Sequence, residues 1–170
     1  SENDDGIYDA MNKGLARISG SYVNFLNAGD VLCHEGFEWV TFNTYLESAM
    51  PKIVACGYMF KDIRGRVKYM APRVITLNYP GMPSSHQALY FRAECVKQII
   101  YNIDLQICGD FDFVMQAISK GSVVTLFDEP CVVFSSGGIS FQNPRKLFYE
   151  SVATFYKYCK FRLILPIKIA

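Results

Sequence analysis

The chain has 170 residues, of which 51% are hydrophobic and 15% aromatic, and its formal net charge is +1. A chain of this length and composition can bury one substantial core, which argues against disorder. The near-neutral charge argues against nucleic acid as a main partner, because phosphate binding usually requires a basic excess. Since every apolar run falls well short of the about 20 residues that span a membrane, and no signal peptide is visible, we expect a cytoplasmic protein.

The six cysteines are scattered along the chain, at positions 33, 56, 95, 108, 131 and 159, and never form a Cys-x-x-Cys pair. This spacing argues against zinc knuckles and dithiol redox motifs. Their apolar neighbours instead indicate reduced thiols in the core.

An amphipathic helix is predicted near the start of the chain. Its apolar positions recur every three or four residues and so share one face; they are Ile7, Met11, Leu15 and Ile18. Asp4 or Asp5 is expected to cap this helix. The polar residues Asp9, Asn12 and Lys13 then lie off the apolar face.

The next part of the chain predicts short strands around a second helix. The expected elements are a strand over 22–26, a polar turn over 27–30, a helix over 36–50, a strand over 52–60, a hairpin turn over 62–66 and a strand over 67–70. The second helix is expected to pack through Phe37, Val40, Tyr45 and Leu46. Pro51 marks its end.

The remaining residues continue the alternation of helices and strands. The expected elements are a Pro- and Gly-rich loop over 78–85, a strand over 88–91, helices over 93–100 and 110–119, strands over 123–127 and 131–134, and a helix from Pro144 towards Arg162. The loop over 78–85 is a candidate part of a site. The alternation predicts a mixed α/β domain over 1–145, followed by a basic-aromatic C-terminal helix over 146–170. Such a helix either packs on the domain, the favoured interpretation, or lies peripherally on an anionic membrane surface.

The polar turn at 27–30 follows an apolar strand and places Asp30 where ligands bind in α/β folds. A second interpretation is that Asn27, Gly29 and Asp30 only form a turn and cap the next helix, because all three residue types suit that role. Asp110 poses the same choice at the start of a later helix, where aspartate is most often an N-cap.

Several segments of the chain, taken in order, resemble the family 2 glycosyltransferases of the GT-A fold. They are Gly-Ile-Tyr-Asp-Ala-Met-Asn-Lys-Gly at 6–14, Ser-Gly-Ser at 19–21, the strand and turn at 22–30, Ser-His-Gln at 85–87 and Cys-Gly-Asp-Phe-Asp-Phe at 108–113. The resemblance is greatest to bacterial enzymes that build capsule, O-antigen or exopolysaccharide. It implies an α/β fold with a GT-A-like mixed sheet flanked by helices. It also implies inverting transfer of a hexosyl group from a nucleotide-diphosphate sugar to a glycan or lipid-linked acceptor.

The resemblance also implies roles for two groups of acids. Asp110 matches the catalytic base that takes the proton from the acceptor hydroxyl, and Asp112 is expected to support it or to bind sugar. We expect the helix N-terminus to lower the pKa of Asp110. Asn27 and Asp30 match a turn that holds a divalent cation, Mg or Mn, against the leaving diphosphate.

The remaining implied site residues surround the substrates. His86 and Gln87 are expected on the acceptor or phosphate side, although His86 is equally well explained as a hydrogen-bonded histidine before a strand. Asp9, Asn12 and Lys13 are expected beside the donor phosphates.

Three positions depart from the family pattern. Asn27 and Gly29 stand where the metal turn often has aspartate, and an amide oxygen is a weaker ligand for a hard cation than a carboxylate. Met11 replaces the familiar arginine before the asparagine. Because of these departures, the resemblance alone does not establish a metal site at 27–30 or the recognition of the donor phosphates by 9–13.

Family members begin with βα units that hold the base and ribose of the donor, and no run before Tyr22 predicts a buried strand. We therefore expect a fragment that lacks the front of the nucleotide-binding half. Two other classes remain open. One is a non-catalytic carbohydrate- or protein-binding module derived from the acceptor half, and the other is a hydrolase that uses Asp110 with Asp30 about 5 to 9.5 Å apart.

Overall fold

The computed structural model describes residues 3–75, 81–159 and 167–169. Its strands are β1 (Tyr22–Val23), β2 (Val31–Leu32), β3 (Ile53–Lys61), β4 (Val67–Met70), β5 (Leu89–Arg92), β6 (Val124–Ser135) and β7 (Ile167–Ile169). Its helices are α1 (Ile7–Leu15), α2 (Trp39–Ala49), the 3-10 helix η1 (His86–Ala88), α3 (Ala93–Val96), α4 (Gly109–Ser119), α5 (Ile139–Gln142) and α6 (Pro144–Cys159). None of the helices in these ranges is long and apolar enough to cross a membrane.

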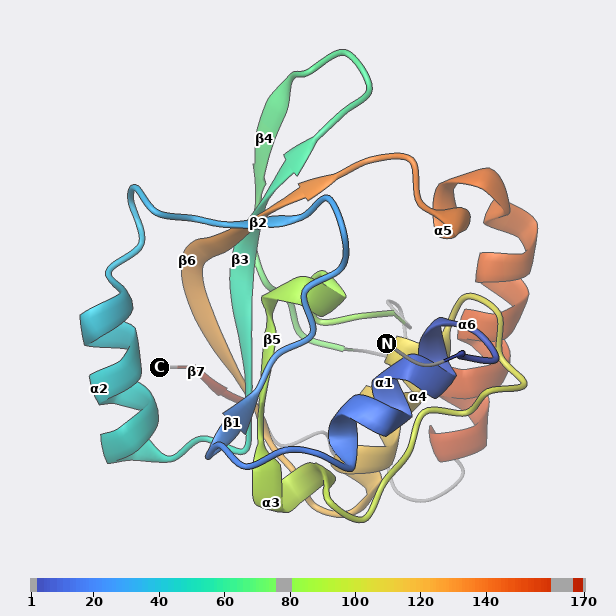
Figure 1. The fold of residues 1–170 in the computed structure, drawn as a ribbon, viewed down its shortest axis with the longest axis horizontal. Helices are drawn as coiled ribbons and strands as arrows, with labels where there is room; N and C mark the ends of the chain where they lie inside the picture. Colours follow the sequence, from blue (N-terminus) through green and yellow to red (C-terminus); the bar gives the residue numbers. More distant parts are fainter. Residues whose placement is uncertain (1–2, 76–80, 160–166, 170) are drawn as a thin grey trace.

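The strands form one mixed sheet in the order β1-β5-β3-β6-β2, in which β4 also pairs with β3 and β7 also pairs with β6 (Figure 1). The central strand β3 runs antiparallel to β4 and β5 and parallel to β6. Helix α2 covers one face of this curled sheet, and α1, α4 and α6 lie on the other side (Figure 1).

The sheet separates two hydrophobic cores because successive side chains of a strand point to opposite faces. On β3, Ile53 and Ala55 belong to the core beneath α1, α4 and α6, whereas Val54 and Cys56 belong to the core beneath α2. All four side chains are fully buried. A two-sided strand of this kind appears in the sequence as a continuous apolar run, which is why β3 was predicted correctly.

The start of α1 differs from the prediction. The residue that precedes the helix is Gly6, whose φ of 111° is a left-handed value, and no side chain caps the helix. Asp5 instead donates its own N–H to the Asp9 carboxylate at 3.0 Å. The buried face also differs, because Tyr8 and Met11 are buried whereas Ile7 is 52% exposed.

The second helix begins at Trp39, three residues later than predicted, and ends at Ala49 just before Pro51, as expected. Leu46 and Phe37 are buried as predicted, but Val40 is 79% exposed and the prediction for it was wrong. Phe42 takes the central position instead and shares a face with Leu46, four residues on. Phe37 precedes the helix, so its spacing of three residues from Val40 does not place Val40 on the buried face.

Two extended segments also differ from the predictions. The strand expected over 22–26 pairs only through Tyr22 and Val23, because the Asn24 side chain then donates to the carbonyls of Gln87 and Leu89. The two late strands are one strand, β6, whose pairing with β3 shifts register near Gly57. Pro130 in β6 lacks a backbone donor, which suits such an irregularity.

The strand predicted over 88–91 is confirmed as β5, whereas the helices on either side of it differ from the predictions. Residues 86–88 form η1 before the strand β5, and the helix expected over 93–100 is the single turn α3. The hairpin into β4 is confirmed, and the Asp62 carboxylate accepts the N–H groups of Arg64 and Arg66 in its turn.

The C-terminal helix is confirmed from Pro144 to Cys159. Residues 160–166, into which the prediction extended, lie outside the described residues, as do 78–80 of the predicted loop. Residues 167–169 are a strand that pairs in parallel with β6, so a helix over the whole of 146–170 is wrong there. Helix α6 packs on α4, and its Phe155 is buried in the core.

Candidate active site

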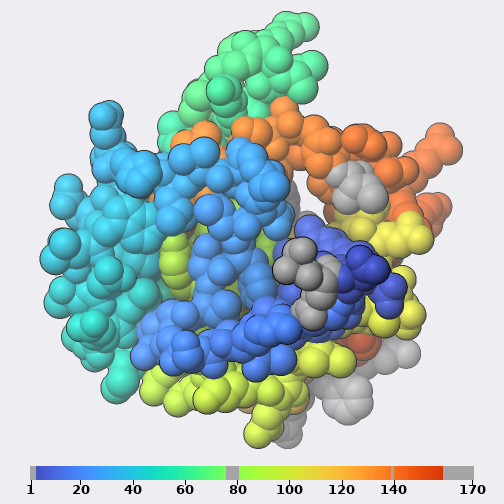
Figure 2. All heavy atoms as spheres, viewed as in Figure 1, coloured from blue at the N-terminus to red at the C-terminus, as the bar shows by residue number. Residues whose placement is uncertain are grey.

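A cavity of about 750 Å³ opens between α1, the segment 81–87, the start of α4 and the first turns of α6. Figure 2 shows the surface hollowed where the N-terminal residues, in dark blue, approach the segment after β6, in orange. One part of the cavity wall is polar and the rest is apolar. The polar side chains include Asn27, Ser84, Ser85, His86, Gln87 and Asp110, and the apolar ones include Met70, Met82, Phe134, Phe141 and Phe148.

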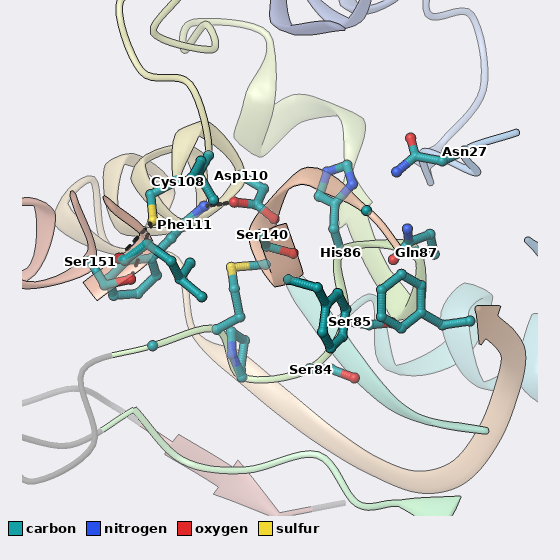
Figure 3. Close-up of a pocket in the computed structure, with 18 of the residues that line it drawn as sticks. Asn27, Ser84, Ser85, His86, Gln87, Cys108, Asp110, Phe111, Ser140 and Ser151 are labelled. Atoms are coloured by element: carbon teal, nitrogen blue, oxygen red, sulfur yellow. Dashed lines mark hydrogen bonds between the residues drawn. The ribbon is translucent and has the colours of Figure 1, made fainter. Parts of the chain in front are cut away.

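Asp110 stands on the first turn of α4 and lines this cavity (Figure 3). The residue that precedes the helix is Cys108, so Asp110 is the second helical residue and not the N-cap. Its Oδ1 accepts the N–H of Phe111 at 2.8 Å. Burial raises the pKa of the carboxyl to about 6 and outweighs the nearby N–H groups, which lower it. The N–H groups of the helix start lower this pKa as expected, but burial has the larger effect, so the net shift is upward.

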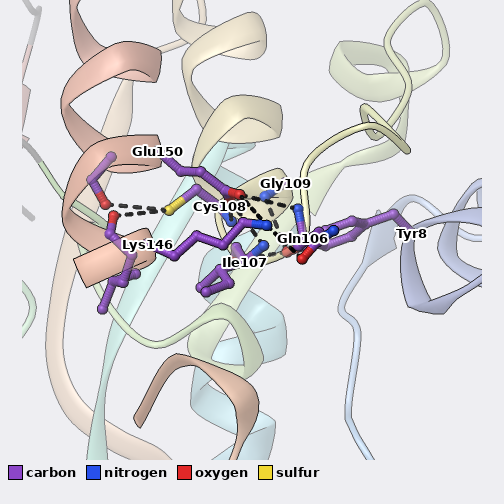
Figure 4. Close-up of polar contacts among 9 residues, drawn as sticks. Tyr8, Gln106, Ile107, Cys108, Gly109, Lys146 and Glu150 are labelled. Atoms are coloured by element: carbon purple, nitrogen blue, oxygen red, sulfur yellow. Dashed lines mark hydrogen bonds and ion pairs between the residues drawn. The ribbon is translucent and has the colours of Figure 1, made fainter. Parts of the chain in front are cut away.

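The segment that leads into α4 is fixed from two sides (Figure 4). From α1, the Tyr8 hydroxyl donates to the carbonyl of Ile107 at 2.8 Å and accepts the N–H of Gly109 at 3.0 Å. From α6, the Glu150 carboxylate accepts the N–H groups of Ile107 and Cys108, each at 3.0 Å. A glycine is required at 109, because a Cβ there would lie 2.6 Å from the Tyr8 ring.

His86 is buried in the polar wall of the cavity. Its Nε2 hydrogen-bonds the Tyr101 hydroxyl at 2.9 Å, and its ring stacks on Phe25. Burial lowers the pKa of this imidazole to about 4, so it is neutral at neutral pH. Burial raises the pKa of both Tyr101 and Tyr8, and the negative charge of Asp110 raises it further. The two hydroxyls therefore interact electrostatically with Asp110.

The turn over 27–30, which was expected to hold a metal ion, lies only partly at the cavity. Asn27 and Gln87 line the cavity (Figure 3), whereas Asp30 does not. The Asp30 carboxylate accepts the Gln87 side-chain amide at 2.7 Å and the N–H of Ser135 at 3.3 Å. Burial raises its pKa. The N–H of Asp30 donates to the Asn27 carbonyl, which closes the predicted turn.

These residues do not by themselves complete a cation site. Among the described residues, no group of three His, Cys, Asp or Glu side chains comes together to hold a metal ion. The turn supplies one carboxylate, whose oxygens already accept hydrogen bonds, and one amide. Divalent cations such as Mg²⁺ prefer several oxygen ligands, commonly including water and substrate phosphates.

The residues expected beside the donor phosphates face away from the cavity. Asn12 makes two hydrogen bonds with the backbone of Tyr101, at 2.9 and 2.7 Å. Lys13 forms ion pairs with Asp4 at 2.9 Å and with Asp9 at 2.7 Å. Their partners raise the pKa of Lys13 and lower that of Asp9. The side chains that α1 brings to the cavity are instead Ile7, Tyr8 and Met11.

Asp112 is not brought to the cavity either. It is 1% exposed, and its carboxylate accepts hydrogen bonds from Lys157 at 2.9 Å, Tyr158 at 3.0 Å and Gln116 at 2.8 Å. This network ties α4 to α6. Asp112 lies two residues from Asp110 and therefore on another side of the helix, so it does not face the cavity in which a sugar would bind.

Sequence reasoning missed the residues that surround Asp110. Tyr101 and Glu150 stand in segments without any motif, so no signal marked them. Tyr8 lies within the block at 6–14, where an aromatic residue was assigned no chemistry. Ser85, next to His86, lines the cavity with a buried hydroxyl that has no hydrogen-bond partner among the described residues.

Comparisons with known proteins place these features in context. No family model matches the chain. An uncharacterized glycosyltransferase of Mycobacterium tuberculosis is 28% identical over 152 residues, which cover 87% of this chain and 58% of that protein. A PGL/p-HBAD biosynthesis glycosyltransferase of Mycobacterium bovis is 25% identical over 130 residues, which cover 74% of this chain and 49% of that protein. The chain thus spans about half the length of the curated relatives it matches.

The fold is shared with a solved structure. The crystal structure of S. aureus TarS 1-349 in complex with UDP-GlcNAc matches with a TM-score of 0.65 at 18% identity, covering 95% of this chain and 49% of that one. A second crystal structure, of S. aureus TarS 1-349, matches with a TM-score of 0.64 at 18% identity. The predicted α/β fold, a mixed sheet flanked by helices, is confirmed. The two mycobacterial relatives are named as glycosyltransferases.

Proposed function

We propose that this chain forms the catalytic and acceptor side of a sugar-nucleotide-dependent, inverting glycosyltransferase, which transfers a hexosyl group to a glycan or lipid-linked acceptor in surface polysaccharide synthesis. The observation that carries the proposal is the Asp110 carboxylate, which lines the cavity with its pKa raised to about 6. A base with a pKa near the working pH is both largely ionised and able to take a proton.

In this mechanism, ionised Asp110 accepts the proton of an acceptor hydroxyl. The hydroxyl oxygen bonds to the anomeric carbon as the bond from that carbon to the diphosphate oxygen breaks. The electron pair of the broken bond leaves with the diphosphate. The sugar is inverted because attack and departure occur on opposite faces.

Other cavity residues orient the substrates in this proposal. The free hydroxyl of Ser85 and the amides of Asn27 and Gln87 offer hydrogen bonds to sugar or phosphate groups. His86 acts as a neutral hydrogen-bonding group, since its lowered pKa leaves it without the positive charge that would attract a diphosphate. The apolar wall suits the hydrophobic faces of a sugar or an acceptor lipid.

The comparisons support the donor class. TarS is described in complex with UDP-GlcNAc and shares this fold, which favours a nucleotide-diphosphate sugar as donor. The relatives are named as glycosyltransferases, and one name refers to PGL/p-HBAD biosynthesis. Since the chain spans about half of those relatives, the activity proposed is that of the whole protein.

A divalent cation, Mg or Mn, remains part of the proposal. Asn27 at the cavity wall would hold it, together with Asp30 if this carboxylate turned from Gln87 toward the cavity, and the cation would neutralise charge on the leaving diphosphate. Because the described residues offer only one carboxylate here, the diphosphate would have to complete the coordination.

Contact with a membrane surface also remains a proposal. The aromatic residues Phe148, Tyr149 and Tyr156 of α6 are exposed. Aromatic and basic side chains on one helix can bind the surface of an anionic bilayer. Such contact would suit an acceptor carried on a lipid diphosphate.

The test compares Asp110→Asn with Asp112→Asn in the full-length protein. Asp110→Asn keeps the shape of the side chain but cannot accept the proton, so turnover should fall about 10²-fold or more with little change in donor affinity. Wild-type turnover should rise with pH through about 6, the pKa of Asp110, because the ionised form is the base. This rise should disappear in the variant.

Asp112→Asn is the matched control. It removes the charge that pairs with Lys157 in the α4–α6 contact, so it should lower the melting temperature more than it lowers the turnover of folded protein. Sugar transfer and thermal melting are measured for both variants. Full activity in Asp110→Asn would end the catalytic role proposed for Asp110, whereas no transfer from any nucleotide sugar by the wild type would favour the non-catalytic binding module. The hydrolase alternative is not favoured, because Asp30 does not line the cavity.

A further inference from the structure

We propose that Glu150 of α6 is a positioning residue, which fixes the backbone ahead of Asp110 and thereby sets where the Asp110 carboxylate points. This inference rests on the proposed role of Asp110 as the base. Glu150 does not line the cavity, and its side chain is 14% exposed. It acts through the segment 106–109 and not on the substrate.

The contacts of Glu150 are made with backbone groups that precede the helix. Its Oε2 accepts the N–H groups of Ile107 and Cys108 at 3.0 Å each, and its Oε1 accepts the N–H of Gln106 at a longer 3.4 Å (Figure 4). Hydrogen bonds to a carboxylate are about twice as strong as those between neutral groups. Glu150 is therefore the main anchor of these N–H groups.

The donors at the start of α4 are satisfied one after another by three different side chains. Glu150 takes the N–H groups of Ile107 and Cys108, the Tyr8 hydroxyl takes that of Gly109, and the Asp110 carboxylate takes that of Phe111. The first N–H groups of a helix lack partners within it and otherwise require caps or water. Here they connect α1 and α6 to the residue proposed as the base.

This arrangement makes the direction of Asp110 depend on α6. Asp110 follows Cys108 by two residues, and its own Oδ1 is bound to the same helix start. A shift of about 1 Å at a reacting group can cost roughly 10²-fold in rate. Loss of the Glu150 contacts would release the backbone N–H groups of the segment 106–109 on the α6 side. The Tyr8 hydroxyl and the side-chain contacts of Cys108 and Gln106 with α6 would still hold the segment, but less tightly.

The titratable groups around this site come from several elements. Tyr8 of α1, Tyr101 from the segment after α3, and Cys108 beside the helix feel the charge of Asp110, which contributes to raising the pKa of each. Lys146 lies 3.9 Å from Glu150. A change in the titration of Asp110 must therefore be compared with a variant that removes the Lys146 charge and leaves the Glu150 carboxylate in place.

The test uses Glu150→Ala and Glu150→Gln, with Lys146→Met and Glu47→Gln as controls. Glutamine keeps an oxygen that can accept the backbone N–H groups, whereas alanine removes it. Lys146→Met removes the neighbouring charge and its hydrogen bond to the Gln106 side chain, but it leaves the Glu150 carboxylate and its bonds to the backbone. Glu47 is an exposed acid of α2 on the other side of the sheet. Two measurements are made for every variant, one on structure and one on activity.

The structural measurement follows the Asp110 side-chain carboxyl by ¹³C NMR as the pH is changed, together with amide hydrogen exchange of Ile107 and Cys108. Glu150→Ala should shift the titration midpoint of Asp110 and speed exchange at both amides, and Glu150→Gln should restore most of the wild-type behaviour. Neither control should shift the titration midpoint of Asp110 or speed exchange at Ile107 and Cys108 as Glu150→Ala does. These results need no catalytic activity, so they remain decisive for positioning even if the proposed function fails.

The activity measurement separates turnover from donor binding in the full-length protein. Glu150→Ala should lower kcat about 10- to 100-fold with the donor KM unchanged, and Glu150→Gln should recover most of the loss. If Glu150→Ala does not fold, Glu150→Met takes its place in both measurements, because methionine fills similar space but does not accept the backbone N–H groups as a carboxylate does. A wild-type Asp110 midpoint and kcat in folded Glu150→Ala or Glu150→Met would overturn the proposal.

Discussion

The face of the sheet beneath α2 and the face that carries the cavity are built from different side chains. Beneath α2, aromatic rings pack on one another edge to face. The ring centroid of Phe42 lies 5.2 Å from that of Phe37 and 5.0 Å from that of Tyr90. On the cavity side, aromatic rings also pack closely, but polar groups are buried among them. These include Tyr8, His86 and Tyr101, with Asp110 at the cavity surface.

This difference indicates a division of roles between the two faces. Packed rings contribute stability through the area that they bury, whereas buried polar groups cost free energy unless they are hydrogen-bonded. A protein keeps such groups where they serve a site, and perturbed pKa values often occur there. Substitutions beneath α2 should therefore change stability, and substitutions at the cavity should change activity.

The largest effect on stability is expected for Phe42→Ala. Phe42 is 1% exposed and contacts four other aromatic rings, so its removal should lower the free energy of unfolding by about 3 to 5 kcal/mol. Urea denaturation measures the loss. Val40→Ala on the same helix is the control, and its effect should be within about 0.5 kcal/mol because Val40 is 79% exposed. Similar losses in both variants would contradict the assignment of the aromatic core.

A smaller effect should appear in how stability depends on pH. Native Asp110 holds its proton up to about pH 6, above the ordinary value of 3.8, so its contribution to stability falls as pH rises through that range. Native His86 binds its proton only near pH 4 instead of 6.5, so its contribution rises with pH over nearly the same range. The two contributions oppose each other in the wild type.

Asp110→Asn removes the first contribution and leaves that of His86. Stability of the variant should therefore rise with pH between about 4 and 6 by roughly 1 kcal/mol per pH unit, more steeply than in the wild type. The variant should also be more stable than the wild type at neutral pH. Urea denaturation across this range checks both expectations, and parallel pH profiles for the two proteins would show that Asp110 titrates normally.

The smallest effect is expected for Ser85→Ala at the cavity. The Ser85 hydroxyl has no partner among the described residues, so its loss should leave the melting temperature unchanged. If it binds substrate, the loss of one hydrogen bond worth about 0.5 to 1.5 kcal/mol should raise KM about 2- to 12-fold. Melting curves and steady-state kinetics test this. A drop in melting temperature with unchanged KM would assign Ser85 to the structure and not to the site.

The sequence predicted most elements but placed some of their faces wrongly. The continuous apolar run of β3 and the turn into β4 were correct, because burial on both faces and turn chemistry are local signals. The face of α2 was wrong at Val40 because Phe37, from which the helical spacing was counted, lies before the helix. One late strand was predicted as two, because its irregular pairing with β3 is not visible along the chain.

The candidate site shows the same limit. Local patterns identified Asp110, His86, Gln87 and Asn27, all of which line one cavity. They also selected Asp112, Asn12 and Lys13, whose side chains hold other segments together. A motif marks a position but not its neighbours, and polar residues on adjacent positions of a helix point in different directions.

The sequence by itself determined which residue types are available and where most elements lie, because periodicity and turn chemistry act over a few residues. Only the tertiary structure decided which side chains meet. It brought Tyr8 and Glu150, 142 positions apart in the sequence, onto the same backbone segment ahead of Asp110. It also decided the sign of the Asp110 pKa shift, because burial depends on the packing of distant elements and here outweighs the local effect of the helix start.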